Sequence, residues 1–161
     1  TNFFRYDFSS YVESGHTYKV SAYIKVDTDA TAGYLFFGSN WDCKNSDTSV
    51  LNYKAGKVVE FTDTKQKNRV MFGLDSDIVA DMYIDNIVIT DITDANNPVV
   101  VDCYNTDFEE STPAATEDTD MLGWSWTDTE VAKATRVWDN GNHMAKLSFT
   151  GKNTNFFNSI I

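Results

Sequence analysis

The amino-acid sequence predicts an all-β protein, an antiparallel β-sandwich of the jelly-roll type. Apolar and polar residues alternate with a period of two along much of the chain, and no long stretch keeps the spacing of an α-helix. Clusters of Asp, Asn, Gly, Ser and Thr divide the chain into short segments, as turns do between the strands of a sandwich. At 161 residues the chain suits a single domain, residues 1–161, built around one core.

The segment from Tyr18 to Val26 has the clearest strand pattern. One face carries Tyr18, Val20, Ala22, Ile24 and Val26, and the other carries Lys19, Ser21, Tyr23 and Lys25. This is the alternation of an antiparallel strand that is buried on one side only.

The same criteria predict the remaining strands and the turns between them. Further strands are expected at 33–38, 57–62, 69–74, 82–90, 99–104, 132–137 and 145–150. Turns are expected at 27–32, 40–47, 63–68, 94–98 and 139–142, and an exposed loop at 111–120. If 123–127 is extended, Trp124 and Trp126 lie on one face of that segment.

Composition and charge narrow the class of partner. The chain carries 13 basic and 24 acidic residues, for a net charge of −11, so nucleic acid and anionic membranes are not expected partners. No segment has the roughly 20 apolar residues of a membrane span. Aromatic residues make up 14% of the chain, more than a core needs, and a surplus of exposed rings is typical of a binding surface.

The two cysteines, Cys43 and Cys103, leave two alternatives open. They form one disulfide if the protein is extracellular and their geometry allows it, or they are free buried thiols.

A tetrapeptide occurs twice in the chain. Thr1-Asn-Phe-Phe4 recurs at Thr154-Asn-Phe-Phe157, 153 residues later, which indicates an internal repeat. The repeat has two interpretations. Either the domain is a circular permutant, in which residues 93–98 close a hairpin, or the chain is one period of a tandem array taken out of phase. A domain-swapped copy that supplies a strand is the alternative to a closed monomer. Four shared residues also fit two strands that use a Phe pair for core packing.

Several motifs resemble the β-sandwich carbohydrate-binding modules of families 4, 9 and 22. They are Gly-His-Thr-Tyr at 15–18, Tyr-Ile-Asp-Asn at 83–86, Asp-Phe-Glu at 107–109, Gly-Trp at 123–124 and Asn-Gly at 140–141. The two parts are in reversed order: residues 102–161 resemble the N-terminal part of the family and residues 1–98 its C-terminal part. Joining the chain ends at the repeat restores the family order, with an aromatic strand before Gly-x-Thr-Tyr.

The resemblance implies a structural calcium ion. Asp85 and Glu109 match positions where these modules often bind calcium, with Asp107 and Glu110 as further ligands and backbone carbonyls near 139–141 completing the shell. The alternative is that these are solvated acids in an acidic protein.

A sugar-binding face needs flat rings and planar polar groups on a rigid frame. Trp41 is the first candidate because it lies in a polar segment with no evident core to fill. The remaining candidates are Trp126, Trp138, Tyr23, Tyr34, Asn40 and Arg69. Each has an ordinary structural explanation as well, as a ring that covers the core or as a solvated surface residue. Trp124 matches a family position that we expect to be structural.

Catalysis has little support in the sequence. The two histidines, His16 and His143, have no metal-ligand spacing, and neither a Gly-x-Ser-x-Gly motif nor a phosphate loop is present. We therefore expect a non-catalytic module of an extracellular bacterial protein that binds a plant polysaccharide (β-glucan, xylan or starch) and is joined to further domains. The alternative is a structural repeat of a surface adhesin or stalk that binds no sugar.

Overall fold

The computed structural model describes the backbone of residues 3–31, 33–40, 44–74, 78–104, 106–109, 124–126, 132–139 and 142–150. Side chains are described for these residues except 3, 44–48, 125, 126, 132–139, 142 and 150. Trp41 and Cys43, together with the predicted loop at 111–120, lie outside these ranges.

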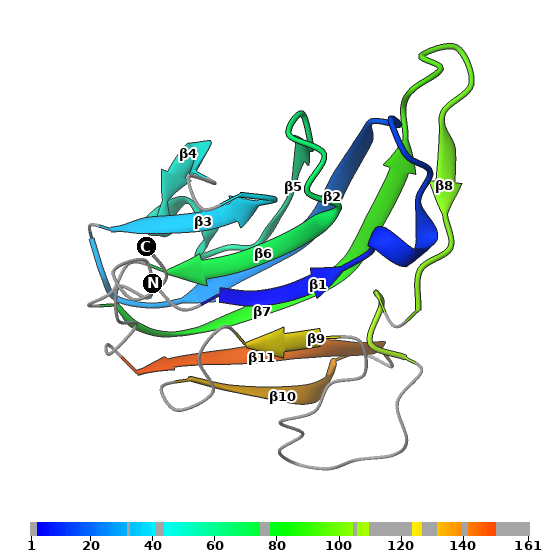
Figure 1. Cartoon of the computed structure of the whole chain (residues 1–161). Helices are drawn as coiled ribbons and strands as arrows, with labels where there is room; N and C mark the ends of the chain where they lie inside the picture. Colours follow the sequence, from blue (N-terminus) through cyan, green and yellow to red (C-terminus); the bar gives the residue numbers. More distant parts are fainter. Residues whose placement is uncertain are drawn as a thin grey trace.

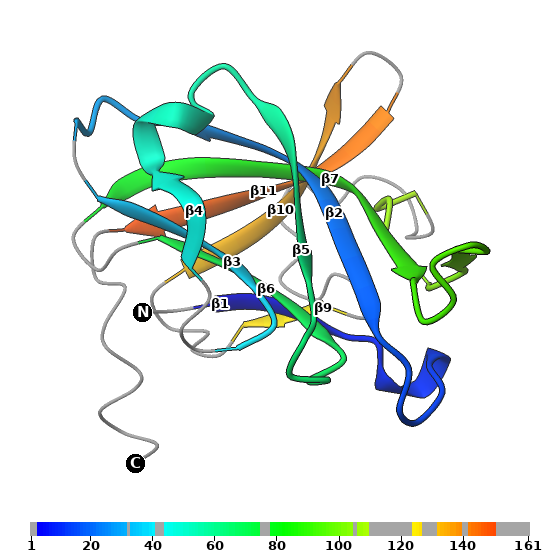
Figure 2. The ribbon, with the colours of Figure 1, turned by 90° about the horizontal axis from the view of Figure 1, so that it is seen from above.

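Two antiparallel sheets pack face to face, as predicted for a β-sandwich (Figures 1 and 2). The first sheet has the order β4-β3-β6-β1-β9, with bounds Lys44–Ser49, Tyr34–Gly38, Arg69–Leu74, Phe3–Asp7 and Trp124–Trp126. The second has the order β10-β11-β7-β2-β5, with bounds Ala132–Asp139, Asn142–Thr150, Val79–Asp91, Tyr18–Asp27 and Lys57–Thr62. A short strand, β8 (Val99–Val101), also pairs with β7.

Helical structure is minor in the described part of the chain. It consists of two 3₁₀ turns, η1 (Ser9–Tyr11) and η2 (Val50–Tyr53). None of the described helices is long and apolar enough to cross a membrane.

The core lies between the sheets and is rich in rings. All five apolar residues predicted for the inner face of β2 are buried, which confirms the period-two interpretation of that strand. Trp124 is buried in the same core, and its ring lies 4.9 Å from the ring of Phe4 with only 9° between the planes. Tyr6, Phe72 and Phe108 also pack around it.

One predicted turn is wrong in part. Residues 40–47 were expected to form a turn because they are polar, but Lys44–Ser49 forms β4 at the edge of the first sheet. Its sequence, Lys-Asn-Ser-Asp-Thr-Ser, has no apolar alternation. Pairing with β3 creates this strand, and an edge strand needs no buried face to satisfy its backbone on one side.

The link between β7 and β8 closes as a hairpin, as predicted for residues 93–98. Asp91 lies opposite Val99, and a turn is formed by the amide of Asn97, which donates to the carbonyl of Asp94 at 3.1 Å. The predicted strand 99–104 is shorter than expected, because only Val99–Val101 pairs with β7.

A bulge divides β7 into two parts with opposite face assignments. Before the bulge the even-numbered residues 80, 82 and 84 are buried, and after it the odd-numbered residues 87 and 89 are buried. The alternation therefore slips by one residue at Asp85 and Asn86. Asn86 has φ of 49°, a left-handed conformation that Asn adopts more readily than most residues. The bulge places Asp85 beside Tyr23 in the neighbouring strand.

Candidate functional site

A buried acidic side chain fixes the segment that follows β3. The hydroxyl of Ser39 donates to Oδ1 of Asp63 at 2.6 Å, and both residues are buried, Asp63 to 1% exposure. Oδ1 also accepts the amide of Lys67 at 3.2 Å, and Oδ2 accepts the amide of Asn68 at 2.7 Å. Because a buried carboxylate is tolerated only when donors satisfy it, this set of bonds holds Ser39 firmly.

Arg69 holds the same point from the other side. Its Nε donates to the carbonyl oxygen of Ser39 at 2.9 Å. This contact follows from topology, since β3 ends where its antiparallel neighbour β6 begins, with Gly38 opposite Met71. We call Ser39, Asp63 and Arg69 the loop anchor. It brings Arg69 close to Asn40, and the next residue along the chain is Trp41.

The other described candidates lie elsewhere. Tyr34, 46% exposed, is at the opposite end of β3 from the loop anchor. Tyr23 is half-buried on the second sheet, with its hydroxyl under Gly56 at the turn before β5. The sequence therefore named residues from at least three places. Among the described candidates, only Asn40 and Arg69 lie in the same place, because Arg69 contacts the carbonyl of Ser39, the residue before Asn40.

Two of the tryptophan candidates are placed by their backbone alone. Trp126 lies opposite Phe4 in β1, and Trp138 lies opposite His143 in β11. Their side chains, and Trp41 as a whole, lie outside the described part of the structure.

The three candidate calcium ligands have different surroundings. Asp85 is buried to 2% exposure, and its Oδ1 accepts the amide of Asn86 at 2.7 Å. Glu109 is held by His143, whose amide donates to Oε1 at 2.6 Å and whose Nδ1 lies 2.7 Å from Oε2. Desolvation raises the pKa of Glu109, but the hydrogen bonds from His143 outweigh it and keep the pKa below its ordinary value. Among the described residues, no group of three or more His, Cys, Asp or Glu is placed to hold a metal.

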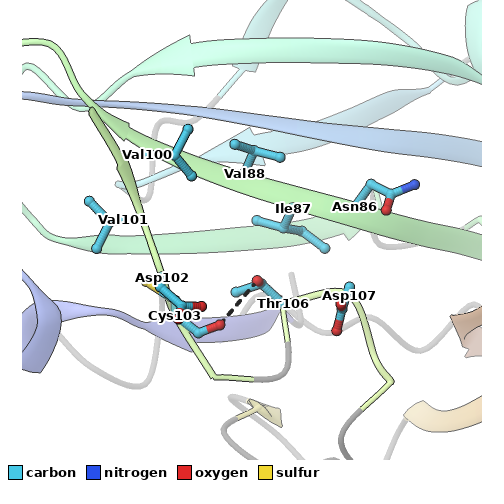
Figure 3. Close-up of a pocket in the computed structure, with 9 residues that line it drawn as sticks. All are labelled: Asn86, Ile87, Val88, Val100, Val101, Asp102, Cys103, Thr106 and Asp107. Carbon is cyan, nitrogen blue, oxygen red and sulfur yellow. Dashed lines mark hydrogen bonds between the residues drawn. The ribbon is translucent and has the colours of Figure 1, made fainter. Parts of the chain in front are cut away.

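Asp107 lines a pocket of about 430 Å³ between β7 and the segment that follows β8 (Figure 3). Its polar lining includes Asn86, Asp102 and Thr106, and its apolar lining comes mainly from valines of β7 and β8. The hydroxyl of Thr106 donates to the carbonyl of Cys103 at 3.3 Å, which stabilises the bend of this segment. Side-chain oxygens that could bind a cation thus lie around Asn86, the residue after Asp85. The carboxylate of Glu109, in contrast, contacts His143.

Cys103 is a free, buried thiol that also lines this pocket. Burial raises the pKa of this thiol to about 11, and the charge of Asp102 adds to the effect. A thiol with this pKa is protonated and unreactive at neutral pH, which agrees with the structural alternative for Cys103.

A second polar contact joins the turn before β2 to the end of β7. Nδ1 of His16 lies 2.6 Å from Oδ2 of Asp91, and Nε2 lies 3.4 Å from a carboxylate oxygen of Glu13. A pocket of about 230 Å³ beside it is lined by His16, Asp91 and the hairpin that follows.

Sequence reasoning did not identify Asp63, Ser39 or the partnership of His16 with Asp91. Asp63 was included only in a predicted turn, where an Asp is common for local reasons. No local signal in the sequence identifies it, because the positive φ values of Gln66 and Asn68 that shape this turn appear only in the structure. Such a turn needs an internal acceptor, which Asp63 provides.

Comparison with protein-family models, with curated proteins and with solved structures finds no match to this chain.

Proposed function

We propose that this domain is a non-catalytic carbohydrate-binding module that binds a neutral plant polysaccharide through the segment at Asn40 and Trp41. The observation that carries the proposal is the loop anchor. Its buried carboxylate and its arginine fix the carbonyl and the hydroxyl of Ser39, two residues before the tryptophan. A ring that stacks on a sugar gains affinity when its support is rigid before binding, because little conformational entropy is then lost.

The polar groups around the anchor suit sugar hydroxyls. Arg69 holds Ser39 through Nε, and its guanidinium is a planar group of the kind that hydrogen-bonds sugar hydroxyls. Asn40 is half-buried and next to Ser39, so its amide is confined to this region. Tyr34, at the far end of β3, would extend the surface along the strand.

The charge of the domain supports a neutral ligand. A net charge of −11 disfavours anionic polymers, whereas β-glucan, xylan backbones and starch carry no charge that it would repel. The resemblance to families 4, 9 and 22 points to the same ligand class and to an extracellular bacterial parent protein with further domains.

The second candidate function is a structural repeat of a surface adhesin or stalk. The observation that favours it is the tetrapeptide Thr-Asn-Phe-Phe, which recurs after 153 residues. A repeated module gives length to a stalk whether or not it binds sugar.

We also propose calcium as a structural ion at Asp85, Asp107 and Glu109. The support is the resemblance at these positions and the oxygen-rich wall that Asn86, Asp102 and Asp107 give the larger pocket. Calcium binding there would require the carboxylate of Glu109 to turn away from His143.

The test of the binding function is a titration with soluble β-glucan, xylan and starch, followed by tryptophan fluorescence and calorimetry. The wild type should bind at least one of the three. Trp41→Ala should abolish that binding with little change in stability, because a stacking ring contributes to the complex and not to the core. Lys54→Ala, an exposed change at another site, is the matched control and should bind as the wild type does. Folded wild type that binds none of the three would favour the stalk.

A further inference from the structure

The chain consists of two parts joined by one short link. Residues 3–91 form β1 to β7, residues 99–150 form β8 to β11, and residues 92–98 connect them. The two parts meet where β7 pairs with β11 and β8, and where β1 pairs with β9. Each part therefore completes a sheet that the other begins.

The outer ends of the two parts lie together. Thr150, the last residue of β11, lies opposite Val79, and Phe3, the first residue of β1, lies opposite Gly73. Val79 and Gly73 flank the same short connection between β6 and β7, so both ends are at one end of the sandwich (Figure 1). The link at 92–98 is at the other end of β7. In the sequence, the first copy of the repeated tetrapeptide runs into β1 and the second follows β11.

The link itself is fastened mainly by the segment that precedes β2. His16 contacts Asp91 at 2.6 Å, the amide of Thr17 donates to Oγ1 of Thr93 at 3.0 Å, and the amide of Ile92 donates to the carbonyl of Thr17 at 2.9 Å. We call these three contacts the latch. They hold the end of β7 at the point where its pairing with β8 begins, since Asp91 also lies opposite Val99.

We propose that two copies of this chain exchange β8 to β11, with residues 92–98 as the hinge and the latch as the element that favours the closed monomer. In the exchanged dimer, β8 to β11 of one copy pair with β7 and β1 of the other, so every strand keeps its partner. Only the conformation of the link differs, and exchange of an identical element is a low-cost route to a dimer. The partner is a second copy of this chain, and the proposal is independent of the proposed sugar site.

The edge at β8 shows that opening the hairpin exposes little new apolar surface. Val99 and Val100 are already 53% and 66% exposed, and β8 makes only three residue pairs with β7. The main contacts to be broken and remade are the six pairs of β11 with β7 and the packing of Trp124 on Phe4, Tyr6 and Phe72, and both sets are identical in the two forms.

The first experiment removes the ability of the hairpin to close. Deleting residues 93–97 leaves a link of Ile92 and Pro98, and two-residue hairpins need positive φ that neither residue adopts. Light scattering after gel filtration should then give a dimer. The matched control inserts Gly-Ser-Gly after Asn96, which lengthens the link and should leave a monomer. A folded, monomeric deletion variant would overturn the proposal.

The second experiment identifies the exchanged strands in the intact link, and it does not depend on the deletion variant folding. Arg5 lies opposite Ser125, so cysteines at these positions are close enough for a disulfide. Copies with Arg5→Cys and copies with Ser125→Cys, both carrying Cys43→Ser and Cys103→Ala, are unfolded together, refolded at high concentration and oxidised. Exchange predicts a covalent dimer, and a chain carrying both cysteines should give a disulfide within the monomer when refolded at low concentration. Absence of a covalent dimer above the level seen with Lys19→Cys in place of Arg5→Cys would contradict exchange.

The latch is tested by Asp91→Asn and His16→Gln in the same mixing assay. Each should raise the fraction of covalent dimer by about two- to fivefold, the range expected when one partly exposed ionic contact is lost. Lys19→Gln, which removes an exposed ion pair with Glu60 away from the link, is the control. If the dimer fraction is unchanged in both latch variants, residues 92–98 alone favour the closed monomer, and the proposed role of the latch is wrong.

Discussion

Trp124 is the residue around which four rings of the core pack. Phe4, Tyr6, Phe72 and Phe108 all have ring centroids within 6 Å of its own. We predict that Trp124→Ala lowers the free energy of unfolding by about 3 to 5 kcal/mol, because a large ring is lost and the cavity closes only in part. Urea unfolding measures the change.

The informative comparison is with Trp41→Ala, which we expect to leave stability nearly unchanged and to abolish binding. If Trp41→Ala unfolds the domain while binding per folded molecule persists, Trp41 belongs to the core. The binding surface would then have to be sought at Trp126, Trp138 and Tyr23.

His16 and Asp91 make stability depend on pH in a defined direction. The hydrogen bond and charge of Asp91, with a smaller effect of Glu13, raise the pKa of His16 despite partial desolvation. Hydrogen bonds from Thr93 and His16 lower the pKa of Asp91 to about 2. The raised pKa of His16 gives stability that is present below about pH 6.5 and lost as the pH rises through the folded value. The lowered pKa of Asp91 gives stability that is lost as the pH falls towards 2.

We therefore predict that Asp91→Asn lowers the melting temperature most between about pH 4 and pH 6.5. The difference between wild type and variant should shrink as the pH rises through the raised pKa of His16. Melting curves at pH 5.5 and pH 8 measure it. A difference that is equal at the two pH values would show that the contact is an uncharged hydrogen bond.

At the scale of the element, the turn between η2 and β5 depends on Gly56. Its φ is 78°, and a Cβ atom there would lie 2.1 Å from the hydroxyl oxygen of Tyr23. We predict that Gly56→Ala lowers the free energy of unfolding by about 2 to 4 kcal/mol, from backbone strain together with the clash. Chemical denaturation measures it.

Two variants separate the two causes of that loss. Gly15→Ala has the same kind of φ, 83°, but open space around it, so it should cost only about 1 to 2 kcal/mol. Adding Tyr23→Ala to Gly56→Ala should recover the part due to the clash, as a double-mutant cycle will show. If Gly56→Ala costs no more than Gly15→Ala, then the ring of Tyr23 moves aside freely.

At the scale of the whole molecule, adding calcium tests whether Asp85, Asp107 and Glu109 form a structural ion site. An ion bound only by the folded state raises the melting temperature by mass action. We predict that calcium raises it after thorough chelation and that Asp85→Ala removes the response, as differential scanning fluorimetry will show.

Magnesium at the same concentration is the control for general screening of a chain with a net charge of −11. An equal response to both ions would indicate screening. Absence of a response to calcium would leave Glu109 as the partner of His143 alone.

The sequence determined the architecture because period-two alternation reports directly which side of a strand is buried. It predicted β5 and β6 with their observed bounds, the inner face of β2 and the hairpin at 93–98. The repeated tetrapeptide adds the prediction that the two ends of the chain are related.

Tertiary structure alone decided three features. β4 exists because β3 lies beside it, since its own residues have no strand pattern. Asp63 reaches Ser39, and His16 reaches Asp91, across 24 and 75 residues of sequence. Neither pair has a local signature, because a turn Asp and an exposed His are common everywhere. The candidate site could therefore be named residue by residue, but its anchor could not, since strand order and register bring its parts together.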